Sequence, residues 1–167
     1  MDIKEKNKQF LQIIDINPNL KKRRDELVKG QHPDTLIITC SDSRVVPEYI
    51  FNARLGELFV IRTAGNVINE GELATVEYAI EHLKVKRIIV LGHTHCGAIH
   101  AAINNEHGMY LDPILNRIKT NISIITNETM AAKMNSIGEA EYLREKFPNF
   151  KGTIESMMYD IETSDVF

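Results

Sequence analysis

The stretch Leu91-Gly92-His93-Thr94-His95-Cys96-Gly97 decides the fold when it is considered together with a distant one, Cys40-Ser41-Asp42-Ser43-Arg44. These two stretches contain both cysteines of the chain, and each follows a short apolar run rich in β-branched residues, at 35–39 and 87–91. Runs of this kind are typical of buried strands in a parallel sheet. The sequence therefore predicts that both thiols lie where strands end.

The two thiols and one imidazole form a candidate set of metal ligands. Cys40, His93 and Cys96 provide the Cys₂His combination with which zinc is bound when a fourth position is left for water or substrate. His95 is the alternative imidazole, but neighbouring residues in an extended turn point apart, which favours His93. A catalytic zinc site is the leading hypothesis. The alternatives are a structural zinc site, which normally has four protein ligands, and a disulfide.

The order of apolar runs and helical patterns along the chain predicts the rest of the fold. Strands at 35–39, 58–62 and 87–91 alternate with helices at 47–52 and 73–83, which is typical of parallel βαβ units. If Cys40 and Cys96 bind one ion, the first and third strands must be neighbours, so the second strand lies on the other side of the first. A last strand at 153–161 completes the order 2-1-3-4, after helices at 97–103, 112–125 and 128–147. We expect an α/β fold with a mainly parallel four- or five-stranded sheet flanked by helices.

The N-terminal region predicts two helices. The first, at 2–14, carries an apolar stripe and ends at Asn17-Pro18-Asn19; the second, at 20–29, has Gly30 as its C′ residue. A terminal helix with an apolar stripe needs a surface to pack on. We expect residues 1–16 to form an arm that packs on a partner subunit.

Length and composition narrow the function classes. A chain of 167 residues suits one domain, spanning 1–167. Its formal net charge of −3 does not favour nucleic acid or an anionic membrane as a partner. No apolar run approaches the roughly 20 residues of a membrane span, and the N-terminus does not lead into a signal peptide. We therefore expect a soluble, cytoplasmic protein with a small-molecule substrate.

Asp42 and Arg44 form a candidate catalytic pair beside the predicted metal. Their spacing places both side chains on one side of an extended turn, where arginine can hold a carboxylate ionised with two hydrogen bonds. A carboxylate held in this way could orient a metal-bound hydroxide, or it could move to become the fourth ligand. Both alternatives stay open at the level of sequence.

These motifs resemble those of the β-class carbonic anhydrases, in which Cys-x-Asp-x-Arg is followed by His-x-x-Cys. The resemblance extends from Gly30 to Ala102, and it resumes weakly at 158–163. It implies zinc-dependent, reversible hydration of carbon dioxide to bicarbonate and a proton by zinc-bound hydroxide, with one Zn²⁺ per chain. The implied ligands are Cys40, His93 and Cys96, and the implied catalytic residues are Asp42 and Arg44.

The same resemblance implies substrate-binding residues and an assembly. Gln31 corresponds to a glutamine that reaches the pocket, commonly across a dimer interface, and Gly97 is a second candidate for substrate binding. Family members usually form dimers or larger homo-oligomers with swapped N-terminal helices. Two alternatives remain: a hydrolase of carbon disulfide or carbonyl sulfide on the same scaffold, and a non-catalytic, zinc-binding regulatory protein.

Overall fold

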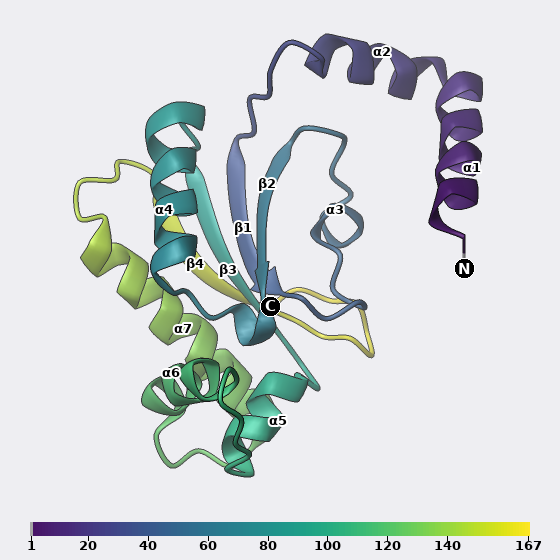
Figure 1. Cartoon of the computed structure of the whole chain (residues 1–167). Coiled ribbons are helices and arrows are strands. Elements are labelled where there is room, and N and C mark those ends of the chain that lie inside the picture. The colour runs from purple at the N-terminus through teal and green to yellow at the C-terminus, as the bar shows by residue number, and fades with distance from the viewer. Residues whose placement is uncertain (1) are drawn as a thin grey trace.

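A four-stranded parallel sheet forms the centre of the protein, whose computed structural model describes residues 2–167. Its strands are β1 (Thr35–Cys40), β2 (Leu58–Thr63), β3 (Arg87–His93) and β4 (Thr153–Tyr159). They lie in the order β2-β1-β3-β4, and each neighbouring pair is parallel (Figure 1). The predicted fold class and strand order are confirmed, with four strands rather than five in the sheet.

The two central strands are buried on both faces, as their continuous apolar sequences predicted. Successive side chains of a strand point to opposite faces, so Leu36 and Ile38 join one hydrophobic cluster and Ile37 joins another. Helices α4 (Glu70–Tyr78) and α7 (Glu128–Lys146) cover the first of these faces. The short helix α3 (Pro47–Ile50) and the chain after it cover the second. Figure 1 shows these two layers on either side of the strands.

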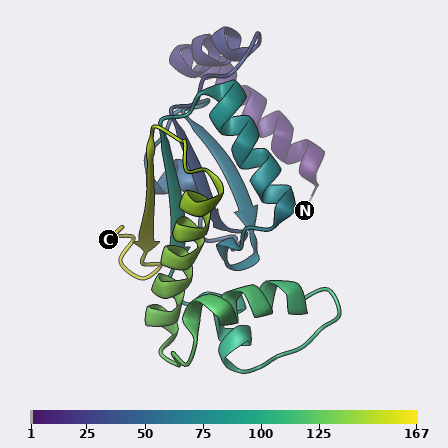
Figure 2. The same cartoon turned by 90° about the vertical axis from the view of Figure 1, so that its left-hand side faces the viewer.

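Helices α5 (Gly97–Ile103) and α6 (Asp112–Ile122) pack together against the first half of α7. Figure 2 shows them beyond the ends of the strands, below the sheet. Their cluster includes Cys40 and Cys96, so the core of this helical layer continues directly into the predicted metal site.

The first two helices project away from the sheet (Figure 1). Helix α1 (Ile3–Ile16) is capped by the Asp2 carboxylate, and α2 (Pro18–Leu27) follows at once. The predicted start of the second helix at residue 20 was wrong, because Asn17 caps it and Pro18 occupies its first turn, where a missing N–H costs nothing. The helix also ends earlier than predicted, at Leu27, so Gly30 is not its C′ residue.

Two further features complete the description. After β4 the chain turns back, and Val166 forms an isolated antiparallel bridge with Tyr159. Across residues 2–167, none of the helices combines the length and apolar composition needed to span a membrane.

Candidate metal centre

The sheet brings the three predicted metal ligands together. Cys40 ends β1, His93 ends the adjacent parallel strand β3, and Cys96 immediately precedes α5. The ligand atoms of these three residues lie within 4.8 Å of one another, and the two sulfur atoms are 3.9 Å apart. All three side chains are buried. Parallel strands end at the same edge of a sheet, which is why ligands 56 positions apart in sequence converge here.

The hydrogen bonding of His93 leaves one ring nitrogen for a metal. Its Nδ1 lies 2.8 Å from the carbonyl oxygen of Thr94, which can only accept, so Nδ1 carries the proton and donates. The Nε2 atom is buried and has no hydrogen-bond partner among the described residues. A metal-ligating histidine typically donates its other N–H to a carbonyl or carboxylate in this way.

His95, the alternative imidazole, points elsewhere. Its side chain is 55% exposed, and its Nε2 lies 3.1 Å from a carboxylate oxygen of Glu162. The residue adopts a left-handed φ of 55°, which turns it away from its neighbours in the loop. The metal-ligand group therefore contains His93 and not His95.

The two thiols cannot both ionise easily while they face each other. The hydrogen bond between the two sulfur atoms lowers the pKa of Cys40 against the opposite effect of burial, and the backbone N–H of Gly65, 3.3 Å from this sulfur, also lowers it. The same hydrogen bond, together with burial, raises the pKa of Cys96. A divalent cation would stabilise both thiolates at once, because a bound metal deprotonates its thiol ligands. The donor set and its unpartnered imidazole nitrogen therefore fit zinc.

Arg44 holds Asp42 at the edge of this site. Its Nε and Nη2 donate to the two carboxylate oxygens at 2.9 and 2.7 Å, and its backbone N–H donates to Oδ1 at 2.9 Å. These hydrogen bonds hold the pKa of Asp42 well below its usual range. Arg44 also donates to the carbonyl of His95, and Arg62 donates to the carbonyl of Asp42. In the described chain, Asp42 lies outside the group of clustered ligand atoms.

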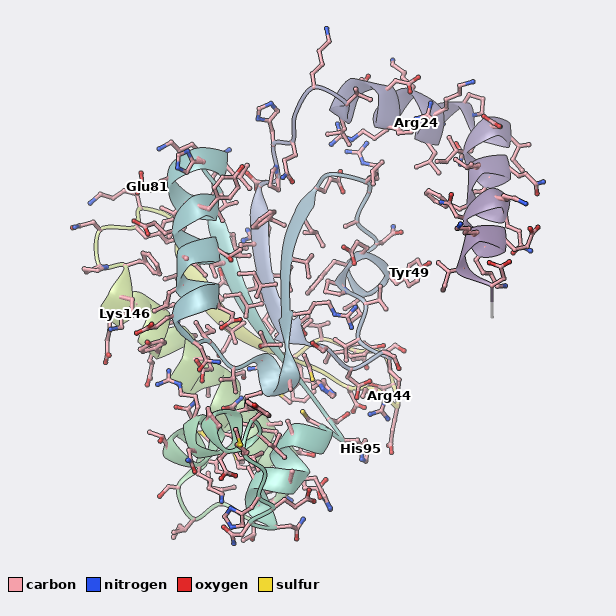
Figure 3. All side chains as sticks on the ribbon, in the orientation of Figure 1. Arg24, Arg44, Tyr49, Glu81, His95 and Lys146 are labelled. Carbon is pink, nitrogen blue, oxygen red and sulfur yellow. The ribbon has the colours of Figure 1, made fainter. Side chains whose placement is uncertain are left out.

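The two candidate substrate-binding residues lie in different places. Gly97 is the exposed first residue of α5, directly after Cys96, and the space beside its Cα is open. Gln31 precedes β1 and lines a surface hollow with Arg24, at the opposite end of the sheet from Cys40. Figure 3 shows Arg24 on α2, far from Arg44 and His95. Within one chain, the structure brings Gly97 to the site and leaves Gln31 distant.

Sequence reasoning assigned no role to Gly65, whose N–H contacts the Cys40 sulfur. The residue has a left-handed φ of 65°, and a Cβ here would come within 2.9 Å of the Ile118 side chain, so glycine is required. The Gly65-Asn66 pair shortly after β2 has the composition of a tight turn. Nothing in the local sequence indicated that this turn contacts a metal ligand.

Comparison with known proteins identifies the family. The model of the carbonic anhydrase family matches residues 35–133, more than half of the chain. The chain belongs to the carbonic anhydrase family. The matched residues include Cys40, His93 and Cys96, so the family's region of similarity contains the whole candidate metal centre.

Individual carbonic anhydrases support this assignment over part of the chain. A carbonic anhydrase of Synechococcus elongatus is 52% identical over 81 residues, which are 45% of this chain and 30% of that protein. Carbonic anhydrase 2 of Mycobacterium tuberculosis is 44% identical over 102 residues, which are 60% of this chain and 49% of that protein. The chain thus spans half or less of the length of these curated relatives.

Solved structures of β-carbonic anhydrases share the fold over almost the whole chain. The enzyme CafA of Aspergillus fumigatus superposes with a TM-score of 0.81 at 25% identity, covering 98% of this chain and 86% of that one. A solved chain from a study of two tetrameric β-carbonic anhydrases of Sordaria macrospora gives a TM-score of 0.81 at 26% identity, covering 99% of this chain and 93% of that one. The similarity therefore includes the N-terminal helices that precede the family match.

Proposed function

We propose that this chain catalyses the zinc-dependent, reversible hydration of carbon dioxide to bicarbonate and a proton. The observation that carries the proposal is the buried Cys40–His93–Cys96 cluster with its unpartnered imidazole nitrogen, in a chain of the carbonic anhydrase family. One zinc ion per chain would be held by these three residues. When bound there, zinc would lower the pKa of a water molecule to about 7 and so would supply a hydroxide nucleophile at neutral pH.

In this proposal Asp42 orients the nucleophile and Arg44 positions Asp42. Because its pKa is held low, the Asp42 carboxylate is ionised at neutral pH and can only accept a hydrogen bond. It can therefore fix the direction of an O–H group and, with it, the lone pair that attacks carbon dioxide. Gly97 offers open space next to Cys96 where a small linear substrate can approach.

Stopped-flow measurement of carbon dioxide hydration, on protein of known zinc content, tests this function. We expect activity at both pH 7 and pH 8.5, because Arg44 engages both oxygens of Asp42 and keeps the carboxylate from serving as a fourth ligand. Activity at pH 8.5 alone would contradict the open site and indicate closure by Asp42. With one zinc bound, inactivity at both values would contradict the proposed reaction. Carbon disulfide and carbonyl sulfide would then be the next substrates to assay, before a regulatory role.

The Arg44→Ala variant is expected to lower turnover about tenfold without loss of zinc, because Asp42 loses the partner that orients it. The hydration rate and the zinc content of the same sample measure the two effects separately. Arg144→Ala is the matched control, since this exposed arginine lies on α7 and bonds the carbonyl of Ile154. Equal rates for Arg44→Ala and the control would contradict the positioning role.

We further propose a homodimer or larger homo-oligomer in which the N-terminal arm, residues 1–16, packs on a partner subunit. Helix α1 exposes large apolar side chains, each 47% or more exposed, that a lone chain leaves in water: Ile3, Phe10, Leu11, Ile13 and Ile16. The structurally similar enzymes of Sordaria macrospora are described as tetrameric. In such an assembly Gln31, which is distant from the metal centre of its own chain, would reach the site of a partner.

The double variant Phe10→Glu, Ile13→Glu is expected to be monomeric, because each new charge would lie in the proposed apolar contact. Sedimentation velocity at a fixed protein concentration measures the change in mass. Lys8→Glu, on the polar part of the same helix, is the control and should leave the mass unchanged. A double variant with the wild-type mass would rule out α1 as the contact.

We also propose that residues 1–167 form one domain and that the protein is located in the cytoplasm. Both cysteines are free thiols that must stay reduced to bind metal, and their sulfur atoms are only 3.9 Å apart. A reducing compartment such as the cytoplasm keeps thiols in this state. Fractionation of cells that express a tagged chain tests the location.

A further inference from the structure

Helix α7 contacts the turn Ala64–Asn66 through a buried polar side chain, and a second one lies on the same face of the helix. The Asn135 Nδ2 donates to the carbonyl of Gly65 at 2.8 Å, and the Glu139 carboxylate accepts from the Asn121 Nδ2, which also donates to Asn135. Asn135 and Glu139 are both completely buried. They are four residues apart, so they project from the same face of the helix. One helix face therefore carries both side chains, and Asn135 bonds the turn directly.

The same turn contacts a metal-ligating sulfur. The Gly65 N–H donates to the Cys40 Sγ at 3.3 Å, and its C=O accepts from Asn135. Hydrogen bonds to a ligating atom stabilise its charged form and fix its direction. Two consecutive hydrogen bonds, both on Gly65, thus connect Asn135 to the Cys40 sulfur.

A second layer of polar contacts fixes Asn135 itself. The Asn121 Nδ2, on α6, donates to both Asn135 Oδ1 and Glu139 Oε1, each at 3.0 Å. Since the carbonyl of Gly65 can only accept, these contacts determine which way the Asn135 amide faces. Gly138 allows the close approach of the helices, because a Cβ there would lie 2.6 Å from Asn121 Cγ.

We propose that Asn135, whose amide is fixed by Asn121, is a positioning residue for the metal centre, which acts through the Ala64–Asn66 turn to keep the Gly65 N–H on the Cys40 sulfur. The inference rests on the zinc site of the proposed function. Buried polar groups destabilise a core unless their hydrogen bonds are satisfied, and a satisfied network specifies one geometry. Here that geometry is the placement of a metal ligand. Asn135 lies outside the 35–133 family match, so it is a feature of this chain beyond the matched motif.

The Asn135→Ala variant tests this role by metal binding, without recourse to turnover. We expect its zinc dissociation constant, measured by competition with a chromogenic chelator, to rise about tenfold. We also expect the thiolate-to-cobalt charge-transfer absorption of the Co²⁺-substituted protein to shift, because the Cys40 sulfur loses its oriented donor. A purely structural role would lower the melting temperature and leave both metal readouts unchanged.

Ser136→Ala is the matched control, since Ser136 is a buried polar neighbour on α7 whose hydroxyl bonds the carbonyl of Lys133 and the Met158 sulfur, and within the described chain it has no hydrogen bond to the turn. It should keep the wild-type zinc affinity and cobalt spectrum. Asn121→Ser is a milder variant at a less buried position, with a smaller change expected in the same direction. If Asn135→Ala does not fold, the zinc affinity and cobalt spectrum of Asn121→Ser test the proposal in its place. Wild-type values of both in the variants that fold would overturn the proposal.

Different results would refute the proposed function and the proposed role of Asn135. Wild-type protein that binds zinc tightly without hydrating carbon dioxide would refute the function, and the zinc affinities of the variants would still test the role of Asn135. An active wild type with unchanged metal binding in Asn135→Ala would support the function and overturn this inference.

Discussion

Replacing Cys40 or Cys96 with serine is expected to abolish zinc binding and catalysis together. Each sulfur is one of only three clustered ligands in the described chain, and a serine hydroxyl does not ionise readily to replace a thiolate. Zinc per chain after dialysis, measured by mass spectrometry, and the hydration rate of the same sample should both fall to background. Circular dichroism would show whether the fold is retained.

Two histidine variants serve as a matched pair for this prediction. His93→Ala should behave like the cysteine variants, because its Nε2 is the unpartnered nitrogen within the cluster. His95→Ala should keep its zinc, because its ring is exposed and bonded to Glu162. Full activity in a zinc-free cysteine variant, or loss of zinc from His95→Ala alone, would contradict the ligand assignment.

The sheet could be predicted because its evidence is local and repeated. Continuous apolar runs of β-branched residues identified β1 and β3, and the need for Cys40 and Cys96 to share an ion placed them side by side. The start of α2 was misplaced for an equally local reason. Asn17 and Pro18 suit both the end of one helix and the start of the next, and the helices follow each other with no loop between them.

The supporting contacts of the site could not be predicted, because they depend on tertiary packing. Asn135 and Glu139 look like solvent-facing positions of a helix when only the sequence is considered. The structure buries both, and Asn135 bonds a turn about 70 positions earlier, as its hydrogen bond to Gly65 shows. The role of Gln31 rests on the family resemblance alone, because in its own chain this residue lies at the opposite end of the sheet from Cys40.

Replacing Arg117 with methionine is expected to lower the free energy of unfolding by about 3 kcal/mol at pH 7.5, because it leaves the buried Glu139 carboxylate without its cation. In the wild type, Arg117 Nε and Nη2 donate to the two Glu139 oxygens at 2.8 and 3.1 Å. The expected cost is at the lower end of the range for a broken buried pair, since the Arg117 side chain is 25% exposed. Urea unfolding of both zinc-free proteins, at one protein concentration, measures the difference.

The pH dependence of this loss identifies its cause. Burial raises the pKa of Glu139, against the hydrogen bonds of Arg117 and Asn121, so removal of Arg117 raises it further. A carboxyl group with a raised folded-state pKa favours folding most at pH values below its unfolded pKa, about 4.3. This contribution declines as pH rises through the folded value. The difference between Arg117→Met and wild type should therefore shrink from pH 7.5 to pH 5.5.

Adding Glu139→Gln to Arg117→Met should recover most of the stability at pH 7.5, because the double variant has no buried charge. The Arg117 guanidinium also lies 4.0 Å from the centre of the Tyr142 ring, which gives a competing explanation for the loss. A decrease in the free energy of unfolding that is equal at both pH values and persists in the double variant would show that the lost contact with the ring is the cause. A loss of stability that both protonation and Glu139→Gln relieve is caused by the unpaired carboxylate, and so by disruption of the polar network that joins α6 and α7 behind the Ala64–Asn66 turn.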